Sequence, residues 1–349
     1  MMLQIYSKLI LYVFSGTGNA YKIAQFIKEK ATEFGLETKI IKLKTGVIPS
    51  TEKSEKKLLI GFLMPTHGFN VPPIMQEFVF KFPKDINADV FILNTRAGLK
   101  MHKLFLPGLS GLAQILPAFI LLLKGYKVIG MQPMDMPSNW ISIHPGVGPV
   151  VQKSISERCE RITKKFTAKI LTGKSAYKAL WSLPLDIAII PVSFLYYFFG
   201  RFFLSKTFIY NYNCNSCGLC AKECPVHAIE MHNDKPYWKL TCESCMHCMN
   251  FCPSRAIETP HVFVALVWWS IGFINAMLVI PWLKYQTGLA PESGLGYWLY
   301  QASYIALGFL VIVSTYYMLH YLMRFRWFSK VISFTSLTHF NFWRRYKAQ

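Results

Sequence analysis

Residues 214–225 read CNSCGLCAKECP, and residues 242–253 read CESCMHCMNFCP. Each stretch places four cysteines at intervals of two, two and three residues and ends in Cys-Pro. Eight of the nine cysteines lie in these two copies, and only Cys159 lies elsewhere. Because this spacing gives three thiolates to one [4Fe–4S] cluster and the fourth to a second cluster, the doubled pattern predicts two clusters.

The crossed ligand pattern divides the eight cysteines into two sets. The first is Cys214, Cys217, Cys220 and Cys252, and the second is Cys242, Cys245, Cys248 and Cys224. A pair of structural zinc sites is the alternative, but such sites usually combine two separated CxxC pairs. Two complete copies that both keep the proline favour iron–sulfur clusters over zinc.

The region around the two copies resembles the bacterial two-cluster ferredoxins over residues 211–258. The resemblance implies the pseudo-symmetric α+β ferredoxin fold and one-electron transfer. The first residues, MMLQIYSKLILYVFSGTG, lead from a short apolar run into a Gly-rich turn without a small-residue cleavage site, unlike a signal peptide. We therefore expect reduced, metal-ligating cysteines in the cytosol rather than disulfides.

The first 175 residues alternate between strand-like and helix-like segments. The predicted strands are apolar runs at residues 9–14, 39–43, 57–64, 90–94 and 127–131. Residues 20–34 carry apolar side chains at helical spacing, and residues 150–171 form a basic amphipathic pattern. Alternation of this kind predicts a doubly wound parallel α/β sheet of flavodoxin size, with five strands.

The segment Ser15-Gly16-Thr17-Gly18-Asn19-Ala20 falls between the first predicted strand and the first predicted helix. Its backbone N–H groups and hydroxyls suit a phosphate at the helix N-terminus. The dinucleotide fingerprint is excluded, because Tyr21 stands where its third glycine would be. The loop resembles the phosphate loop of flavodoxins, which implies FMN as the ligand; a tight turn without a ligand is the alternative.

Three further segments, residues 65–70, 95–98 and 136–140, follow predicted strands at their carboxyl ends. Ligands bind at these ends in open parallel sheets. The resemblance to flavodoxins implies that such loops pack against the flavin ring, and local packing is the alternative for each residue. The candidate FMN contacts are His67, Gly68, Phe69, Thr95, Gly98, Asn139 and Trp140. No catalytic residue is assigned.

Taken together, the phosphate-type loop, the segment Met136-Pro137-Ser138-Asn139-Trp140 and both cysteine copies resemble a group of flavodoxin–ferredoxin fusion proteins over residues 8–258. The resemblance implies electron transfer without fixing the donor or the acceptor. The net charge of this chain does not fit the resemblance, because flavodoxins and ferredoxins are usually acidic. This chain has 38 basic and 18 acidic residues and a net charge of +20, which disfavours a freely diffusing carrier.

The composition points to a membrane. Hydrophobic residues make up 52% of the chain and charged residues only 16%, against about 25% charged in soluble domains. Such a chain has enough apolar surface to exclude disorder. A basic and hydrophobic chain suits an anionic membrane surface; nucleic acid is the alternative for the charge alone, but it is not expected beside apolar spans.

Residues 262–283 and 297–323 contain no Asp, Glu, Lys or Arg. Each exceeds the roughly 20 residues that a transmembrane helix needs. The tail after residue 323 carries basic residues and no acidic ones, so the positive-inside rule places it in the cytoplasm. Two crossings return the chain to its starting side. We therefore expect a two-span protein of the cytoplasmic membrane with both termini and the redox domains in the cytoplasm.

Two other apolar stretches are harder to interpret. Residues 104–123 are uncharged and long enough to cross, but they separate two strands of the predicted sheet, so we expect a helix packed on that sheet with its outer face near lipid. Residues 187–200 are uncharged but short, which suits a buried, interfacial or re-entrant segment.

The sequence thus predicts five parts: residues 1–175 as the FMN-binding α/β domain, 176–207 as an apolar connector, 208–260 as the two-cluster domain, 261–323 as a transmembrane hairpin and 324–349 as a basic interfacial tail. We expect a membrane-anchored protein that passes electrons between FMN, the two clusters and a redox protein or a quinone. The alternatives are an oxidoreductase that reduces quinone or another small acceptor with flavin, and a non-redox membrane adaptor with a degenerate flavin site.

Overall fold

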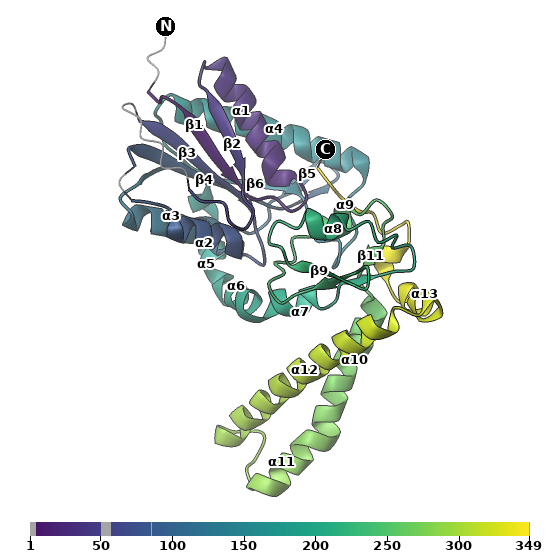
Figure 1. Ribbon diagram of the computed structural model, residues 1–349. Helices are drawn as coiled ribbons and strands as arrows, with labels where there is room; N and C mark the ends of the chain where they lie inside the picture. The colour runs from purple at the N-terminus through teal and green to yellow at the C-terminus, as the bar shows by residue number, and fades with distance from the viewer. Residues whose placement is uncertain (1–4, 50–56, 85, 349) are drawn as a thin grey trace.

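The computed structural model describes residues 5–49, 57–84 and 86–348. Figure 1 shows an α/β domain, a smaller cysteine-rich domain packed against it, and two long helices that run away from the body and back. The C-terminal segment, in yellow, returns from these helices to the α/β domain. Three parts that are separate in sequence therefore meet in one body.

The α/β domain is built on a mainly parallel sheet with the order β2-β1-β3-β4-β6-β7. Its five main strands follow the flavodoxin order, in which the second strand lies at one edge. The apolar runs of β1 and β3 are buried along their whole length, as expected for central strands covered on both faces. The five strands are β1 (Leu9–Val13), β2 (Thr38–Lys42), β3 (Leu58–Pro65), β4 (Ala88–Met101) and β6 (Lys127–Pro137).

Helices cover both faces of this sheet. α1 (Asn19–Glu33) and α4 (Pro149–Leu171) share one hydrophobic core with one face. α2 (Pro73–Lys81) and α3 (Leu112–Leu123) cover the other face (Figure 1). The predicted doubly wound α/β architecture is confirmed.

The sheet has more strands than the five predicted. β5 (Leu104–Leu106) pairs antiparallel with the end of β4, and β7 (Ala176–Tyr177) pairs parallel with β6. The prediction of a single helix over residues 104–123 is therefore wrong at its start. Pro107, Gly108 and Gly111 separate β5 from α3, and Gly111 adopts a positive φ of 53° that favours glycine.

The connector between the two domains is a series of short helices. Asp186 fixes it to the α/β domain, because one of its carboxylate oxygens accepts hydrogen bonds from the backbone N–H groups of Ser110 and Gly111, both at 2.8 Å. The segments Lys178–Ala188 and Ile190–Ser205 meet at an angle of 75°. The connector contains η1 (Lys178–Ser182), α5 (Leu183–Ala188), α6 (Ile190–Leu195), η2 (Tyr196–Gly200) and α7 (Arg201–Ser205).

The cysteine-rich domain repeats one unit twice. Left-handed backbone conformations recur 28 positions apart, at Ser216 and Ser244, at Gly218 and Met246, and at His227 and Arg255. These positions set the same turns around both cysteine copies, as pseudo-symmetry requires. The elements are β8 (Ile209–Tyr210), α8 (Leu219–Lys222), β9 (Ile229–His232), β10 (Lys235–Trp238), α9 (His247–Phe251) and β11 (Ile257–Glu258).

Among the described residues, two helices are long and apolar enough to cross a membrane, and the bent connector would make a third if it were one span. The first runs over His261–Thr287 and contains α10 (His261–Ile274), η3 (Asn275–Val279) and α11 (Ile280–Thr287). The second is α12 (Gly294–Leu322). Asn275 is buried between them, and its side-chain oxygen accepts a hydrogen bond of 3.5 Å from the Ser303 hydroxyl.

The basic tail differs from a simple surface segment. α13 (Arg326–Phe334) does expose Trp327, Val331 and Phe334. Residues 343–348 instead pack into the body, where Trp343 and Tyr346 are buried. Arg345 explains part of this return, because its guanidinium donates hydrogen bonds to the carbonyl oxygens of Met249, Arg255 and Ile257. The expected interfacial character therefore applies at most to the first part of the tail. η4 (Leu337–His339) links the two parts.

Candidate iron–sulfur and flavin sites

The fold brings cysteines of the two copies close to one another. Cys220 lies close enough to Cys214, Cys217 and Cys252 for their charges to act on its thiol. Cys242 is similarly placed beside Cys245 and Cys224, and Cys248 beside Cys242 and Cys224. Cys248 also lies near Cys220 of the first set. Cysteines of each copy thus have neighbours from the other copy, and the division into two crossed sets stays a prediction.

The surroundings of these sulfur atoms suit metal clusters. A cavity of about 300 Å³ is lined by the whole first set, Cys214, Cys217, Cys220 and Cys252. Backbone N–H groups also point at sulfur atoms in both copies: Ala228 donates to Cys224 and Ala256 to Cys252, both at 3.3 Å. Hydrogen bonds of this kind stabilise thiolate ligands and tune cluster potentials.

The two sets differ in their exposure. Cys224, Cys242, Cys245 and Cys248 are all buried, whereas Cys217 of the first set is exposed. Burial raises the pKa of the Cys245 and Cys248 thiols well above the ordinary value. The first set thus lies nearer to solvent than the second set, which is buried throughout.

The loop of residues 15–20 occupies the turn from β1 to α1, as predicted. Gly18 has a φ of 99°, and its backbone N–H donates to the Ser15 hydroxyl at 3.1 Å. Within the described residues, the backbone N–H groups of Gly16, Thr17, Asn19 and Ala20 have no hydrogen-bond partner. Free N–H groups at a helix N-terminus are the donors that a phosphate requires, so the loop fits the phosphate of FMN.

A cavity of about 240 Å³ opens beside this loop, at the carboxyl ends of β3, β4 and β6. Five of the candidate FMN contacts and Asn19 of the phosphate-type loop line this cavity. The five candidates are Gly68, Phe69, Thr95, Asn139 and Trp140. Asn139 also donates a hydrogen bond of 2.8 Å from its side-chain nitrogen to the Thr17 hydroxyl, which ties the two loops together. The position and the lining suit a planar aromatic ligand.

Two candidate flavin contacts lie elsewhere. His67 does not line the cavity: it is 2% exposed, its ring packs edge-on against Phe14, and neither ring nitrogen has a hydrogen-bond partner within the described residues. Burial lowers its pKa to about 4, so the ring is neutral. Gly98 does not line the cavity either, and a Cβ there would collide with the backbone of Asp135. Both positions shape the loops rather than the ligand site.

Each of the three predicted loops overlaps the strand that it follows: residue 65 lies in β3, residues 95–98 in β4 and residues 136–137 in β6. β4 and β6 pair in parallel from Asp89 and Lys127 to Gly98 and Pro137, so residues 95–98 and 136–137 belong to the sheet. Arg96, which sequence reasoning did not select, lines the cavity and forms a buried ion pair of 2.7 Å with Asp135. Its only sequence signal was a charged residue three positions after the apolar run that ends at Leu93.

The second cysteine set lies directly on the phosphate-type loop. The ring nitrogen Nδ1 of His247 donates a hydrogen bond of 2.7 Å to the carbonyl oxygen of Gly16. Gly16 is required at this contact, because a Cβ there would collide with the carbonyl oxygen of Cys245. A further link is the hydrogen bond of 2.8 Å from the Ile74 N–H to the Glu243 carboxylate. The 242–248 loop and the 15–20 loop thus form one interface.

The C-terminal segment closes this interface from a third side. The backbone N–H of Ala348 donates to the carbonyl oxygen of Thr17 at 2.8 Å. The Tyr346 hydroxyl donates to the side-chain oxygen of Asn19 at 2.6 Å, and the Tyr346 N–H donates to the side-chain oxygen of Asn250 at 2.8 Å. One residue of the tail therefore bonds both to the phosphate-type loop and to the cysteine-rich domain.

Comparison with known proteins identifies one of these domains. A family model described as a 4Fe-4S dicluster domain matches residues 213–257. Similar solved structures include rubredoxin oxygen:oxidoreductase from the anaerobe Desulfovibrio gigas, at 12% identity over 46% of this chain and 37% of that chain, with a TM-score of 0.27. The chain thus spans little more than a third of that protein.

Two further solved structures are similar. A flavodoxin from the domain Archaea has 15% identity over 47% of this chain and 97% of its own, with a TM-score of 0.30. A proposed quinone reductase from Klebsiella pneumoniae has 12% identity over 47% of this chain and 85% of its own, with a TM-score of 0.28. No curated protein matches this chain.

The matched domain and the strand order define the class of protein. The chain joins an iron–sulfur domain to an α/β domain with flavodoxin topology. This architecture supports electron transfer.

Proposed function

We propose that the chain is a membrane-anchored electron-transfer protein in which an FMN site and two [4Fe–4S] clusters form one internal path. The observation that carries this proposal is the interface of the 242–248 loop with the 15–20 loop, where His247 bonds to Gly16. Two redox domains that worked independently would not need to bury a cluster-ligand loop against a phosphate-type loop. Close placement of redox centres is what a protein contributes to electron transfer.

The exposure of the cysteines supports an order for this path. The buried set of Cys242, Cys245, Cys248 and Cys224 adjoins the FMN site, and the set that contains exposed Cys217 faces outward. The inner set is thus positioned to exchange electrons with the flavin. The outer set is positioned to exchange electrons with a redox protein that docks on this face.

In the α/β domain, the free N–H groups of Gly16, Thr17, Asn19 and Ala20 would hold the phosphate of FMN. Phe69 and Trp140 would contact its ring. When bound, FMN supplies the conversion between two-electron and one-electron carriers. Asn139 orients the Thr17 hydroxyl, and the ion pair of Arg96 with Asp135 holds the cavity wall in place.

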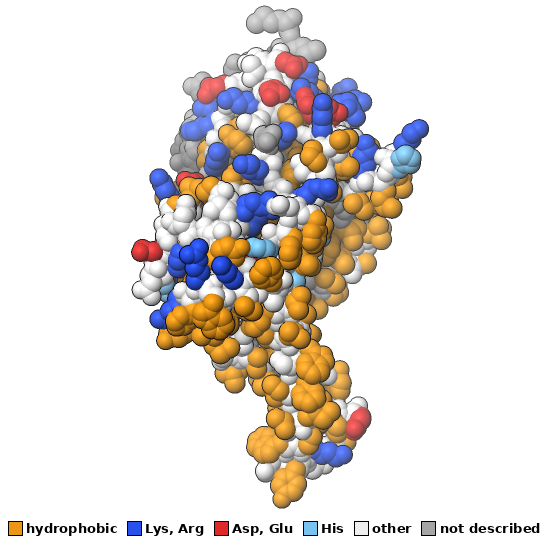
Figure 2. Space-filling model, turned by 90° about the vertical axis from the view of Figure 1, so that its right-hand side faces the viewer, with side chains coloured by type: hydrophobic (Ala, Val, Ile, Leu, Met, Phe, Trp, Pro, Cys, Tyr) orange, Lys and Arg blue, Asp and Glu red, His pale blue; other side chains and the backbone are white. Residues whose placement is uncertain are grey.

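The proposed anchor is the helix pair over His261–Thr287 and Gly294–Leu322. Most of its side chains face outward and are apolar. Figure 2 shows this apolar surface over most of the stalk and on the adjoining part of the body, with charged side chains at the far tip. The basic tail favours a cytoplasmic position for both termini and for the redox domains. The apolar connector then lies on the same membrane surface, since Leu185, Leu195 and Phe199 are exposed.

The cofactor content of the full-length protein, purified in detergent, tests this proposal. We expect about eight iron atoms, about eight acid-labile sulfides and one FMN per chain. Replacing Cys217 by Ser should damage the outer cluster far more than the inner one, as seen by electron paramagnetic resonance. Cys159→Ser is the matched control, because the Cys159 thiol is buried in the α/β domain and donates to the Asp135 carbonyl. Two zinc ions without labile sulfide would contradict the proposal.

A further inference from the structure

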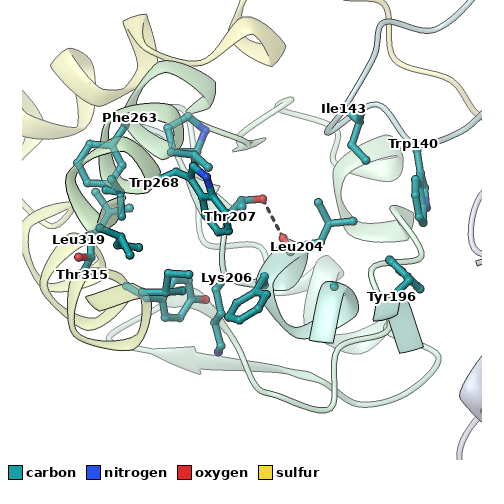
Figure 3. A pocket seen from close by; sticks show the side chains of 18 residues that line it. Trp140, Ile143, Tyr196, Leu204, Lys206, Thr207, Phe263, Trp268, Thr315 and Leu319 are labelled. Atoms are coloured by element: carbon teal, nitrogen blue, oxygen red, sulfur yellow. Dashed lines mark hydrogen bonds between the residues drawn. The ribbon is translucent and has the colours of Figure 1, made fainter. Parts of the chain in front are cut away.

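A third cavity, larger than the one at the sheet edge, lies where the body meets the helix pair. It has a volume of about 350 Å³ and is shown in Figure 3. Its walls come from the loop after β6, the connector, α10 and α12. Each of these elements contributes side chains to the lining, among them Trp140, Tyr196, Leu204, Phe263, Trp268 and Thr315. The size suits a ring compound rather than a single water or ion.

This cavity adjoins the proposed FMN site. Trp140 lines both the larger cavity and the cavity at the sheet edge. Its ring packs against that of Tyr196, with 5.3 Å between the ring centres. One indole side chain therefore forms a shared wall between the two cavities.

The cavity is also close to the inner cysteine set. Lys206 and Tyr316 line it, and both lie near enough to Cys242 for its charge to act on them. Lys206 donates a hydrogen bond of 2.6 Å from its ammonium to the carbonyl oxygen of Trp238. Trp238 is fully buried in the core that contains Cys242 and Cys248. A molecule in this cavity would lie beside both redox sites.

The cavity is reached from the apolar side of the molecule. Trp268 lines it, yet 56% of this side chain is exposed on α10. Val264, Val267 and Ile271 continue the lining along the same helix. A ligand that dissolves in the membrane could therefore enter between the body and α10, without passing through water.

The lining also limits the chemistry of the ligand. It is almost entirely apolar, and the Lys206 ammonium is already bonded to Trp238. A charged ligand would lose its hydration without compensation. Within the described residues, the Thr315 hydroxyl and the Trp140 indole N–H have no hydrogen-bond partner, so donors are available for a ligand that only accepts. A small uncharged ring with carbonyl oxygens meets these conditions.

We propose that this cavity binds the ring of a membrane quinone, whose carbonyl oxygens accept hydrogen bonds from lining donors such as Thr315. The proposal rests on the proposed function, because only a redox role explains why the ligand should be a quinone rather than a lipid. Under this proposal, the redox partner is a quinone dissolved in the bilayer. It reaches the inner cysteine set and the FMN site from the membrane side.

Photolabelling of the full-length, cofactor-loaded protein in detergent tests this site. The probe is an azido-benzoquinone, decylubiquinone is the competitor, and labelled peptides are identified by mass spectrometry. We expect label on α10 or on the segments around Trp140 and Leu204, and protection by decylubiquinone. Val267→Trp should fill the cavity and reduce the protected label at least tenfold. Leu266→Trp is the matched control, because Leu266 is the neighbouring residue, is exposed and does not line the cavity.

A second pair of variants changes the side-chain volume less, so that a loss of protection can be separated from misfolding. Thr315→Val keeps the shape and removes one donor, so decylubiquinone should protect about fivefold less well, the loss expected for one hydrogen bond. Ser314→Ala changes a neighbouring hydroxyl that does not line the cavity and should leave protection unchanged. Equal protection in Thr315→Val and the wild type, or equal competition by oleate, would overturn the proposal, since oleate would indicate a site for acyl chains.

Reduction of the clusters by flavin, measured in the same preparation without quinone, separates this inference from the proposed function. Internal electron transfer without protected labelling would overturn the quinone site alone. Protected labelling without internal electron transfer would contradict the proposed function while the cavity remained a quinone site.

Discussion

The imidazole of His247 donates a hydrogen bond of 2.7 Å from Nδ1 to the carbonyl oxygen of Gly16. His247 lies between Cys245 and Cys248 in the sequence, and Gly16 lies in the loop between β1 and α1. The hydrogen bond therefore joins a proposed cluster-binding loop to a proposed phosphate-binding loop across 231 positions of sequence. The Tyr346 hydroxyl reaches the same loop through Asn19, so two domains and the C-terminal segment meet at one point.

Replacing His247 by Ala should loosen this interface. We expect a loss of about 1 kcal/mol in stability, the usual value of one hydrogen bond, and slower electron transfer between flavin and clusters. Denaturant unfolding and stopped-flow spectroscopy measure the two effects. His232→Ala is the control, because the His232 side chain is 55% exposed and lies on β9. Equal losses in both variants would show that the Gly16 contact has no special role.

Replacing Thr17 by Asp should release FMN. Thr17 is buried in the phosphate-type loop, and a carboxylate there would repel the phosphate dianion. We expect the flavin content of the purified protein to fall severalfold, measured by flavin fluorescence after acid release. Thr32→Asp adds the same charge to an exposed position on α1 and should keep its flavin. Unchanged flavin in the Thr17 variant would mean that the loop is not the phosphate site.

His67 should make the stability of the α/β domain depend on pH. Its folded pKa of about 4 lies below the unfolded value of 6.5, because burial disfavours the charged ring. The stability gained by burying the neutral ring is therefore fully present above pH 6.5. The free energy of unfolding then falls as the pH falls toward 4, because the unfolded chain takes up the proton first. Between pH 7 and pH 5 we expect a loss of about 2 kcal/mol in the free energy of unfolding. His67→Leu should flatten this dependence, and an equally steep profile in that variant would contradict the assignment.

The membrane topology can be read with reporter fusions. A reporter placed after residue 290, between the two long helices, should report the exterior, and reporters at residues 176 and 349 should report the cytoplasm. A fusion at residue 210 should also report the cytoplasm. An exterior signal at residue 210 would mean that the bent connector crosses the membrane and that the proposed two-span arrangement is wrong.

Local patterns predicted much of this molecule. The doubled cysteine spacing predicted a repeated fold, in which left-handed backbone conformations recur 28 residues apart. The apolar runs predicted the central strands, because strands covered on both faces need continuous apolar sequence. The uncharged stretches predicted both long helices within a few residues.

Contacts between distant segments could not be predicted in this way. The end of β4 is set by its pairing with β6, so residues 95–98 joined the sheet although they look like a loop. His67 turns inward and packs against Phe14, and nothing in the local sequence distinguishes this direction from one toward the cavity. The bond from Tyr346 to Asn19 spans 327 positions, and the basic tail carries no local signal that it returns to the first loop.

The most direct test of the account is rapid freeze-quench electron paramagnetic resonance after photoreduction of the flavin in the full-length protein. The account predicts that reduced-cluster signals grow at the expense of reduced flavin, at a rate independent of protein concentration and slowed by His247→Ala but not by His232→Ala. A rate that rises in proportion to protein concentration, or flavin that stays reduced beside oxidised clusters, would show that electrons do not pass across the interface between Gly16 and His247 and would contradict the account.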